Sequence, residues 1–403
     1  MIRRSILVLS LFSGLAEGLL AQGDFAKGSF GYDKAFLEKH YPDMITLRSK
    51  DGKAMVMISP QHQGRVMTST ADGLKGASFG WLNYALLETG RFLTHITPVG
   101  GEERFWLGPE GGQFSLYFKK GDPFDYEHWQ VPSEIDSKPF GVINTSADKA
   151  EFQQHIDLVN YSGTNLRMLV KRTITLMPTD EAFKTLGVKD WKSTRIVSFS
   201  SENEVTNTGS ESWGERSGMP SIWILSMLNP GPHCTIFIPF KKEGDGKFLT
   251  DDYFGKVPPE RLKITEGSIM FRADGKYRSK IGLAPFAAMA LAGSYDSDTK
   301  VLTIVRFSQP GTGKYVNSQW KIQEDPFSGD IINSYNDGPL ADGSQMGPFY
   351  ELESSSPAAN LAPGQKLVHR HMTTHIVATE KELDRITRSV FNLPLGKIKN
   401  AFK

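Results

Sequence analysis

The sequence contains almost no cysteine: Cys234 is the single one among 403 residues. One thiol cannot form an intrachain disulfide, and it excludes a metal site built from several cysteines. Cys234 stands at the start of an apolar run, and no His/Asn set accompanies it that would indicate a nucleophile. We therefore expect a buried structural thiol.

An excess of charge of either sign is also missing, because 46 Lys and Arg residues nearly balance 45 Asp and Glu residues. Such a chain lacks the electrostatic footprint of a protein that binds nucleic acid or an anionic membrane. No stretch beyond the N-terminus is long and apolar enough to cross a bilayer. We expect neither a nucleic-acid partner nor a membrane span, and no cofactor.

The N-terminus has the pattern of an export signal. Two arginines precede a short apolar stretch from Ile6 to Phe12, and small residues follow, with cleavage expected after Ala16 or Ala21. We interpret residues 1–21 as a signal peptide and expect a periplasmic or secreted protein. The alternative is a disordered leader of a cytosolic protein.

Helix signals are scarce. Residues 33–40 fit a short helix, and residues 379–392 fit a better one, with Thr379 as the cap and Glu382 completing a capping box. Most of the remaining chain consists of short apolar runs cut by Gly, Pro, Asn and Asp, which indicates strands. The clearest are 54–59, 114–118, 165–176, 194–205, 235–239, 300–307 and 366–377.

This spacing predicts an all-β, mostly antiparallel sandwich or barrel, and the lack of strand–helix alternation argues against a doubly wound fold. No shift in composition marks a boundary, so we expect one domain over residues 25–403. Two polar segments, 241–259 and 325–347, are predicted to be long loops, and such loops are often functional.

The first candidate site is the glycine-rich segment from His95 to Gly112. Between its glycines stand Glu102, Glu103, Arg104, Trp106 and Glu110. A guanidinium and carboxylates can bind sugar hydroxyls, while an aromatic face covers the apolar side of the ring. The alternative is a tight hairpin held by a structural Arg–Glu pair.

The second candidate, residues 331–339, ends in Asn-Asp-Gly-Pro, which first of all indicates a turn. Its polar residues Asn333, Asn336 and Asp337 could also line a cleft.

The third candidate is residues 349–365. On a strand Glu351 and Glu353 point the same way, roughly 6 to 7 Å apart. Two acids on one face suit acid/base chemistry or the binding of hydroxyls or a cation. The alternative is a solvated strand face.

The fourth candidate comprises His369, His371 and His375, which share one face of a strand. Four strand residues span about 13 Å, too far for His371 and His375 to hold one ion, so we expect no metal. The alternatives are a polar sheet face or one histidine in a sugar pocket.

The third and fourth candidates together resemble the C-terminal part of galactose mutarotase-like (aldose 1-epimerase-like) proteins. The shared features are a Leu-Glu-x-x strand at 352–355, a Pro-containing loop, a Pro-Gly turn within 361–365 and a final strand. Residues 205–209, Val-Thr-Asn-Thr-Gly, resemble a strand end that precedes the family's catalytic histidine motif. The Gly-Gly-Glu-x-Arg-Phe-Trp and Tyr-Glu-Leu-Glu stretches resemble an exported bacterial subfamily of unknown function. This resemblance implies a β-supersandwich with a saccharide cleft on its concave face.

By the same resemblance Glu353 takes the position of the general base that removes the anomeric hydroxyl proton. The family's partner, a histidine in His-x-Tyr-Phe-Asn, is absent: the local sequence is Trp-Ile-Leu-Ser-Met-Leu-Asn at 223–229. The replacement acid is then His95 or Lys280. Arg104, Trp106, Lys280 and Glu353 should converge on one surface.

We therefore expect a carbohydrate partner, with substrate-binding residues Arg104, Trp106, Glu110, Asn336, Asp337 and Glu351. The activity is either that of a non-standard sugar epimerase or isomerase, or binding without turnover. A glycoside-cleaving enzyme using Glu351 and Glu353 is a third alternative. It is disfavoured because catalytic carboxylates must flank one bond, which two residues on the same strand face seldom do.

Overall fold

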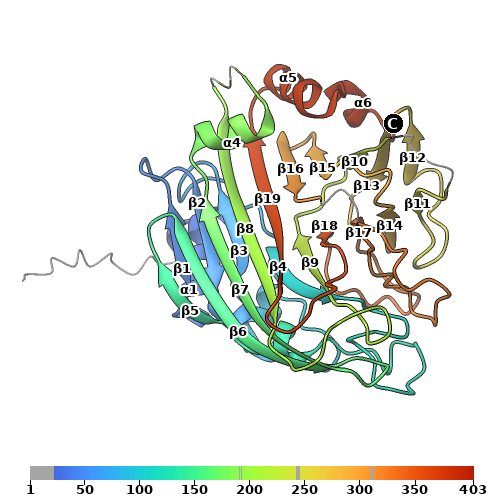
Figure 1. The fold of residues 1–403 in the computed structure, drawn as a ribbon. Helices are drawn as coiled ribbons and strands as arrows, with labels where there is room; N and C mark the ends of the chain where they lie inside the picture. Colours follow the sequence, from blue (N-terminus) through green and yellow to red (C-terminus); the bar gives the residue numbers. More distant parts are fainter. Residues whose placement is uncertain (1–21, 190, 192, 242–245, 310–312) are drawn as a thin grey trace, which may run out of the picture.

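The computed structural model describes residues 22–189, 191, 193–241, 246–309 and 313–403. The predicted signal peptide lies outside these residues. Two large antiparallel sheets stack face to face, which confirms the predicted all-β sandwich (Figure 1). The sheets have nine and ten strands in the part of the chain that is described.

The nine-stranded sheet positions the site. Its strands, in spatial order, are β1 (Ile45–Arg48), β2 (Met55–Ser59), β3 (Arg65–Thr70), β4 (Gly101–Gly108), β9 (Ser221–Met227), β18 (Tyr350–Ser355), β17 (Ile332–Asn336), β14 (Ser279–Leu283) and β11 (Leu249–Thr250). Strands far apart in sequence are therefore neighbours, since β9 lies between β4 and β18.

The ten-stranded sheet forms the second layer. Its strands are β12 (Leu262–Thr265), β13 (Ser268–Arg272), β10 (Cys234–Pro239), β15 (Leu291–Asp296), β16 (Val301–Phe307), β19 (Lys366–Val377), β8 (Arg195–Asn207), β7 (Asn165–Leu176), β6 (Lys149–Val159) and β5 (Gly141–Thr145). Cys234 is buried at the start of β10, as expected.

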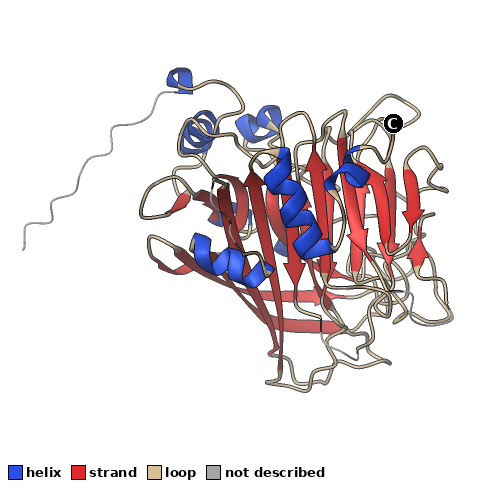
Figure 2. Cartoon of the chain, turned by 90° about the horizontal axis from the view of Figure 1, so that it is seen from above, coloured by secondary structure: helices blue, strands red, loops and turns tan. Residues whose placement is uncertain are grey.

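Short helices lie at the ends and on the outside of the sheets (Figure 2). They are α1 (Phe30–His40), α2 (Tyr84–Thr89), α3 (Ser133–Asp136), α4 (Thr179–Leu186), α5 (Glu380–Phe391) and α6 (Leu395–Lys399), with 3-10 turns η1 (Gln22–Asp24) and η2 (Pro60–His62). Apolar residues of α4, α5 and α6 pack on β10, β15, β16 and β19, so these helices cover the outer face of the ten-stranded sheet. Within the described residues, no helix has the length and apolarity needed to span a membrane.

Several local predictions are confirmed. Strands β7 and β19 have the predicted bounds, and the C-terminal helix is α5, with the Thr379 hydroxyl accepting the Glu382 N–H at its start. Two predictions are wrong. Residues 114–118 form turns and bends rather than a strand. The segment 325–347 contains a central strand, β17, because its polar residues are bonded within the sheet.

Side-chain alternation on β18 assigns the two faces of the nine-stranded sheet. Leu352 packs in the core between the sheets, and the Ser354 hydroxyl bonds His369 Nε2 at 2.9 Å on β19. Glu351 and Glu353 therefore point away from the second sheet. They are nevertheless buried, so they do not form the solvated strand face that was the alternative interpretation.

Candidate functional site

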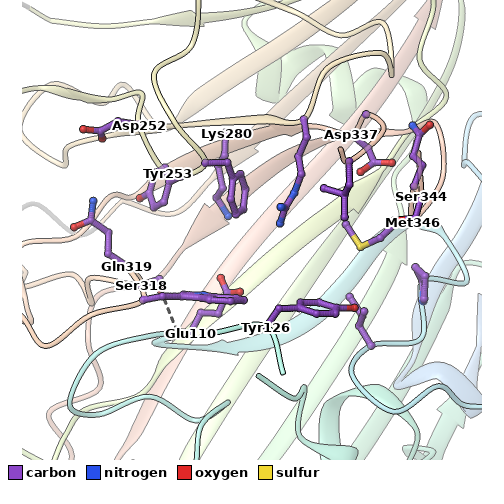
Figure 3. Close-up of a pocket in the computed structure, with 18 of the residues that line it drawn as sticks. Glu110, Tyr126, Asp252, Tyr253, Lys280, Ser318, Gln319, Asp337, Ser344 and Met346 are labelled. Atoms are coloured by element: carbon purple, nitrogen blue, oxygen red, sulfur yellow. Dashed lines mark hydrogen bonds between the residues drawn. The ribbon is translucent and has the colours of Figure 1, made fainter. Parts of the chain in front are cut away.

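A cleft of about 840 Å³ lies beside β14 and β17. One side carries Tyr253, Lys280 and Asp337, and the other carries Glu110, Ser318 and Tyr126 (Figure 3). Both polar segments expected to be functional contribute to its lining, which also includes Phe254, Arg278, Trp320, Asp342 and Met346. Its size is in the range of small-molecule sites, roughly 300 to 1,000 Å³.

Sheet register brings four predicted site residues to one face. Arg104 and Glu353 both lie opposite Leu225, which separates them on β9. Lys280 and Glu351 both lie opposite Tyr335 on β17. Because side chains opposite one another on paired strands share a face, all four project from the outer face of this sheet.

These residues form two buried ion pairs. Arg104 Nη2 lies 2.8 Å from Glu351 Oε1, and Lys280 Nζ lies 3.1 Å from Glu353 Oε2. The indole N–H of Trp223 donates to the same Glu353 oxygen at 2.9 Å. The Arg104 guanidinium also lies 4.1 Å from the centre of the Trp106 ring. The expected convergence of Arg104, Trp106, Lys280 and Glu353 is therefore present in the structure.

The residues of this cluster differ in their access to the cleft. Lys280 lines the cleft, whereas Arg104, Trp106, Glu351 and Glu353 are buried residues that do not belong to its lining. Lys280 is thus the member of this cluster that lines the cleft.

The neighbouring carboxylates determine the protonation state of Lys280. Burial acts to lower the pKa of Lys280, but the carboxylates of Glu353, Glu110 and Glu351 outweigh it and raise the pKa. Lys280 therefore remains an ammonium ion at neutral pH. A raised pKa makes this ammonium a weaker proton donor.

Two carboxyl groups of the site have pKa values above that of an exposed glutamate. Burial, opposed by Arg104 and assisted by the Glu353 charge, raises the pKa of Glu351. Burial also raises the pKa of Glu110, with the Lys280 charge opposing it. Of the two, Glu110 lines the cleft, so it is a carboxyl that can carry a proton next to a ligand.

The second expected donor, His95, lies in the loop before β4 but does not belong to the cleft lining. Its Nδ1 is 2.6 Å from the carbonyl oxygen of Trp129, and its ring packs 4.7 Å from the Tyr126 ring. The ring is thus engaged in holding the loop, which corrects its expected placement at the reacting centre.

The residues of the second candidate separate at the end of β17. Asp337 lines the cleft, where it accepts the Tyr335 hydroxyl at 2.7 Å and the Gly347 N–H at 3.1 Å. Burial raises the pKa of Asp337. Asn336 faces the other way, and its amide bonds the backbone of Tyr277 and Gly275. Its expected place in the cleft is corrected, because consecutive strand residues point to opposite faces.

The three histidines of β19 lie between the sheets. His369 and His371 both bond the Ser354 hydroxyl, and burial lowers the pKa of each, so they are neutral. His375 lies 2.9 Å from Glu102 Oε2. In the described part of the chain no group of three or more His, Cys, Asp or Glu side chains could hold a metal ion.

The glycine-rich segment also ties the two sheets together. Glu103 pairs with Arg172 of β7 at 2.8 Å, with both side chains fully buried. A register irregularity between Gly101 and Arg104 lets the neighbouring Glu102 and Glu103 both reach the other sheet. The ion pairs of this segment are therefore long-range ones, unlike the local hairpin pair of the alternative interpretation.

Sequence reasoning missed several aromatic residues of the site. Trp223 holds Glu353, while Tyr253 and Trp320 line the cleft. Arg278 also lines it, with its guanidinium 3.9 Å from the centre of the Phe254 ring. Their positions depend on loops and strand pairing, and only the richness in aromatic residues indicated such a surface.

A family model described as "Family of unknown function (DUF6786)" matches residues 28–402. The chain belongs to this family. No curated protein matches it. Among solved structures, the Slr1438 protein from Synechocystis sp. PCC 6803 is similar with 12% identity and a TM-score of 0.50, over 83% of this chain and 96% of that one.

A Klebsiella pneumoniae protein described as a "putative aldose 1-epimerase" is also similar, with 10% identity and a TM-score of 0.50, over 89% of this chain and 84% of that one. A galactose mutarotase-like protein from Lactobacillus casei has 13% identity and a TM-score of 0.45, over 83% of this chain and 99% of that one. At a TM-score of 0.50, the Klebsiella structure supports the aldose 1-epimerase-like fold that the resemblance of this DUF6786 member implied. At these identities the similarity concerns the fold alone.

Proposed function

We propose that the protein binds a saccharide in the cleft and that the Lys280–Glu353 pair serves binding rather than proton transfer. The observation that carries this proposal is that Glu353 Oε2 accepts hydrogen bonds from both Lys280 Nζ and the Trp223 indole N–H. A base must be within reach of the proton that it removes. Glu353 does not belong to the cleft lining, whereas the lysine paired with its Oε2 atom does.

The lining suits a sugar. Tyr126, Tyr253 and Trp320 offer aromatic surface for the apolar face of a pyranose. Glu110, Lys280 and Asp337 offer charged groups for its hydroxyls. A cleft with apolar walls and a few polar groups is typical of small-molecule sites.

The cleft also contains the guanidinium of Arg278. Arg278 forms no ion pair with a carboxylate in the portion of the chain that is described, although it stacks on Phe254. A planar guanidinium binds a carboxylate with two parallel hydrogen bonds. We therefore include uronic acids among the sugars expected to bind.

A second candidate function, epimerase-type turnover, is favoured by one observation. Glu110 has a raised pKa and lies across the cleft from Lys280 (Figure 3). A protonated Glu110 could deliver a proton to a sugar ring oxygen, a step in opening the ring. In this case Glu110, rather than Glu353, carries the acid/base chemistry.

Calorimetric titration of the wild type with galactose, glucose, galacturonic acid and glucuronic acid tests the proposal. Binding to at least one of them is expected, and Tyr126→Ala should weaken it about tenfold because it removes stacking surface. Tyr126 is 58% exposed, so this change should leave the fold intact. Ile264→Ala, at a 53% exposed residue outside the cleft lining, is the matched control.

A further inference from the structure

A second cavity, of about 440 Å³, adjoins the cleft. Tyr253 and Gln319 line both cavities and form the divide between them. Two neighbouring cavities with a shared wall are the arrangement that a ligand longer than one ring can occupy.

Tyr253 contacts charged groups of both cavities. Lys280 Nζ lies 5.6 Å from the centre of its ring, on the side of the cleft. Its hydroxyl donates to Asp330 Oδ2 at 2.6 Å and accepts from Asn333 Nδ2 at 3.2 Å, and Asp330 lines the second cavity. One side chain therefore presents its ring to one cavity and its hydroxyl to an acid of the other.

The local backbone makes room for this acid. A Cβ atom at Gly282 would lie 2.0 Å from Asp330 Oδ2, so the carboxylate can lie over β14 because that residue has no side chain. Burial, opposed by hydrogen bonds from Tyr253 and Thr250, raises the pKa of Asp330 to about 6. The carboxyl group is thus held in a defined position next to the cavity.

The rest of the lining suits another sugar ring. Phe286 is 42% exposed and provides an aromatic surface, while Asn317, Ser328 and Lys247 provide polar groups. Exposed aromatic rings beside hydrogen-bonding side chains are what carbohydrate recognition requires. The lining has both kinds of group, as the cleft does.

We propose that the second cavity is a saccharide subsite continuous with the cleft, so that the ligand is an oligosaccharide whose chain passes the Tyr253–Gln319 divide. This inference rests on the proposed function, because the first ring must occupy the cleft. The second ring then packs on Phe286 and bonds Asp330.

The test is a chain-length series measured by calorimetry on the full-length protein. The probes are galacturonic acid with its dimer and trimer, and glucose with cellobiose and cellotriose. The longer members of one series should bind about tenfold more tightly than the monomer. Phe286→Ala and Ala284→Trp, which respectively remove the stacking surface and fill the cavity, should abolish this gain and leave monomer affinity unchanged.

Ile264→Ala again serves as the control and should retain the gain. If a monomer binds and its oligomers bind no more tightly, the subsite is wrong while the proposed function stands. A gain that persists in both variants also overturns the subsite, because the extra rings then lie elsewhere. If no probe binds at all, the proposed function and the subsite fail together. Phe286→Ala alone decides the matter if Ala284→Trp does not fold, since Phe286 is exposed.

Discussion

Lys280 Nζ lies 3.1 Å from Glu353 Oε2, so the carboxylate that the resemblance indicated as a general base is paired with a lysine that lines the cleft. The two residues come from β14 and β18, with β17 between them, and are 73 positions apart in sequence.

Removing one member of this pair should destabilise the fold. Lys280→Met leaves the buried Glu353 carboxylate without its cation, and we expect a loss of about 3 to 5 kcal/mol in the free energy of unfolding. The double variant Lys280→Met/Glu353→Gln should recover part of that loss, because no unpaired charge remains. Urea unfolding of the wild type, both single variants and the double variant measures the coupling. Strictly additive effects would contradict a direct pair.

Arg278 should determine preference for acidic sugars. Arg278→Gln removes a guanidinium that has aromatic contact but no acidic partner within the described ranges, so it should weaken uronic acid binding about tenfold and neutral hexose binding little. Arg216→Gln, at an exposed arginine outside the lining, is the control. Equally weakened binding of acidic and neutral sugars would mean that Arg278 shapes the cleft and does not select for a carboxylate.

Asp330 should make stability depend on pH. Its pKa rises from the ordinary 3.8 to about 6 in the folded protein, so between these values the unfolded chain loses its proton first. The contribution of Asp330 to the free energy of unfolding therefore falls through this window by roughly 1 to 3 kcal/mol. Asp330→Asn should lack this pH-dependent contribution, because an amide does not titrate in this range.

The check is urea unfolding of the wild type and Asp330→Asn from about pH 4 to pH 7. The stability difference should move in favour of the variant as the pH rises through the window and then level off. A difference that stays constant over this range would show that the Asp330 carboxyl titrates alike in both states.

Sequence reasoning could predict the elements whose side chains alternate. Strand β7 was predictable because apolar and polar residues alternate along it over a long run. Strand β9 has every residue buried, so it shows no alternation, and Trp223 gave no sign of its contact with Glu353. A turn-forming sequence at its end likewise hid the strand β17.

The site was predictable only in part, because contacts between distant strands and loops build it. The resemblance indicated Glu353, and a strand pattern placed Glu351 beside it, but neither could show that Lys280 rather than Glu353 lines the cleft. Tyr253 and Arg278 reach the cleft through the packing of loops, which no local pattern records. His95 was expected at the centre because it precedes a Gly-Gly pair, as the substrate-binding histidine of the resembled family does, yet a backbone carbonyl holds its ring.

Anomer exchange measured by NMR tests the role of the Lys280–Glu353 pair most directly. The experiment adds wild type or Glu353→Gln to each hexose and uronic acid and follows exchange between the α and β anomers alongside binding. We expect at least one sugar to bind while exchange stays at the buffer rate with both proteins. Exchange that the wild type accelerates and Glu353→Gln does not would show that Glu353 acts as a base, and would contradict its assignment to binding.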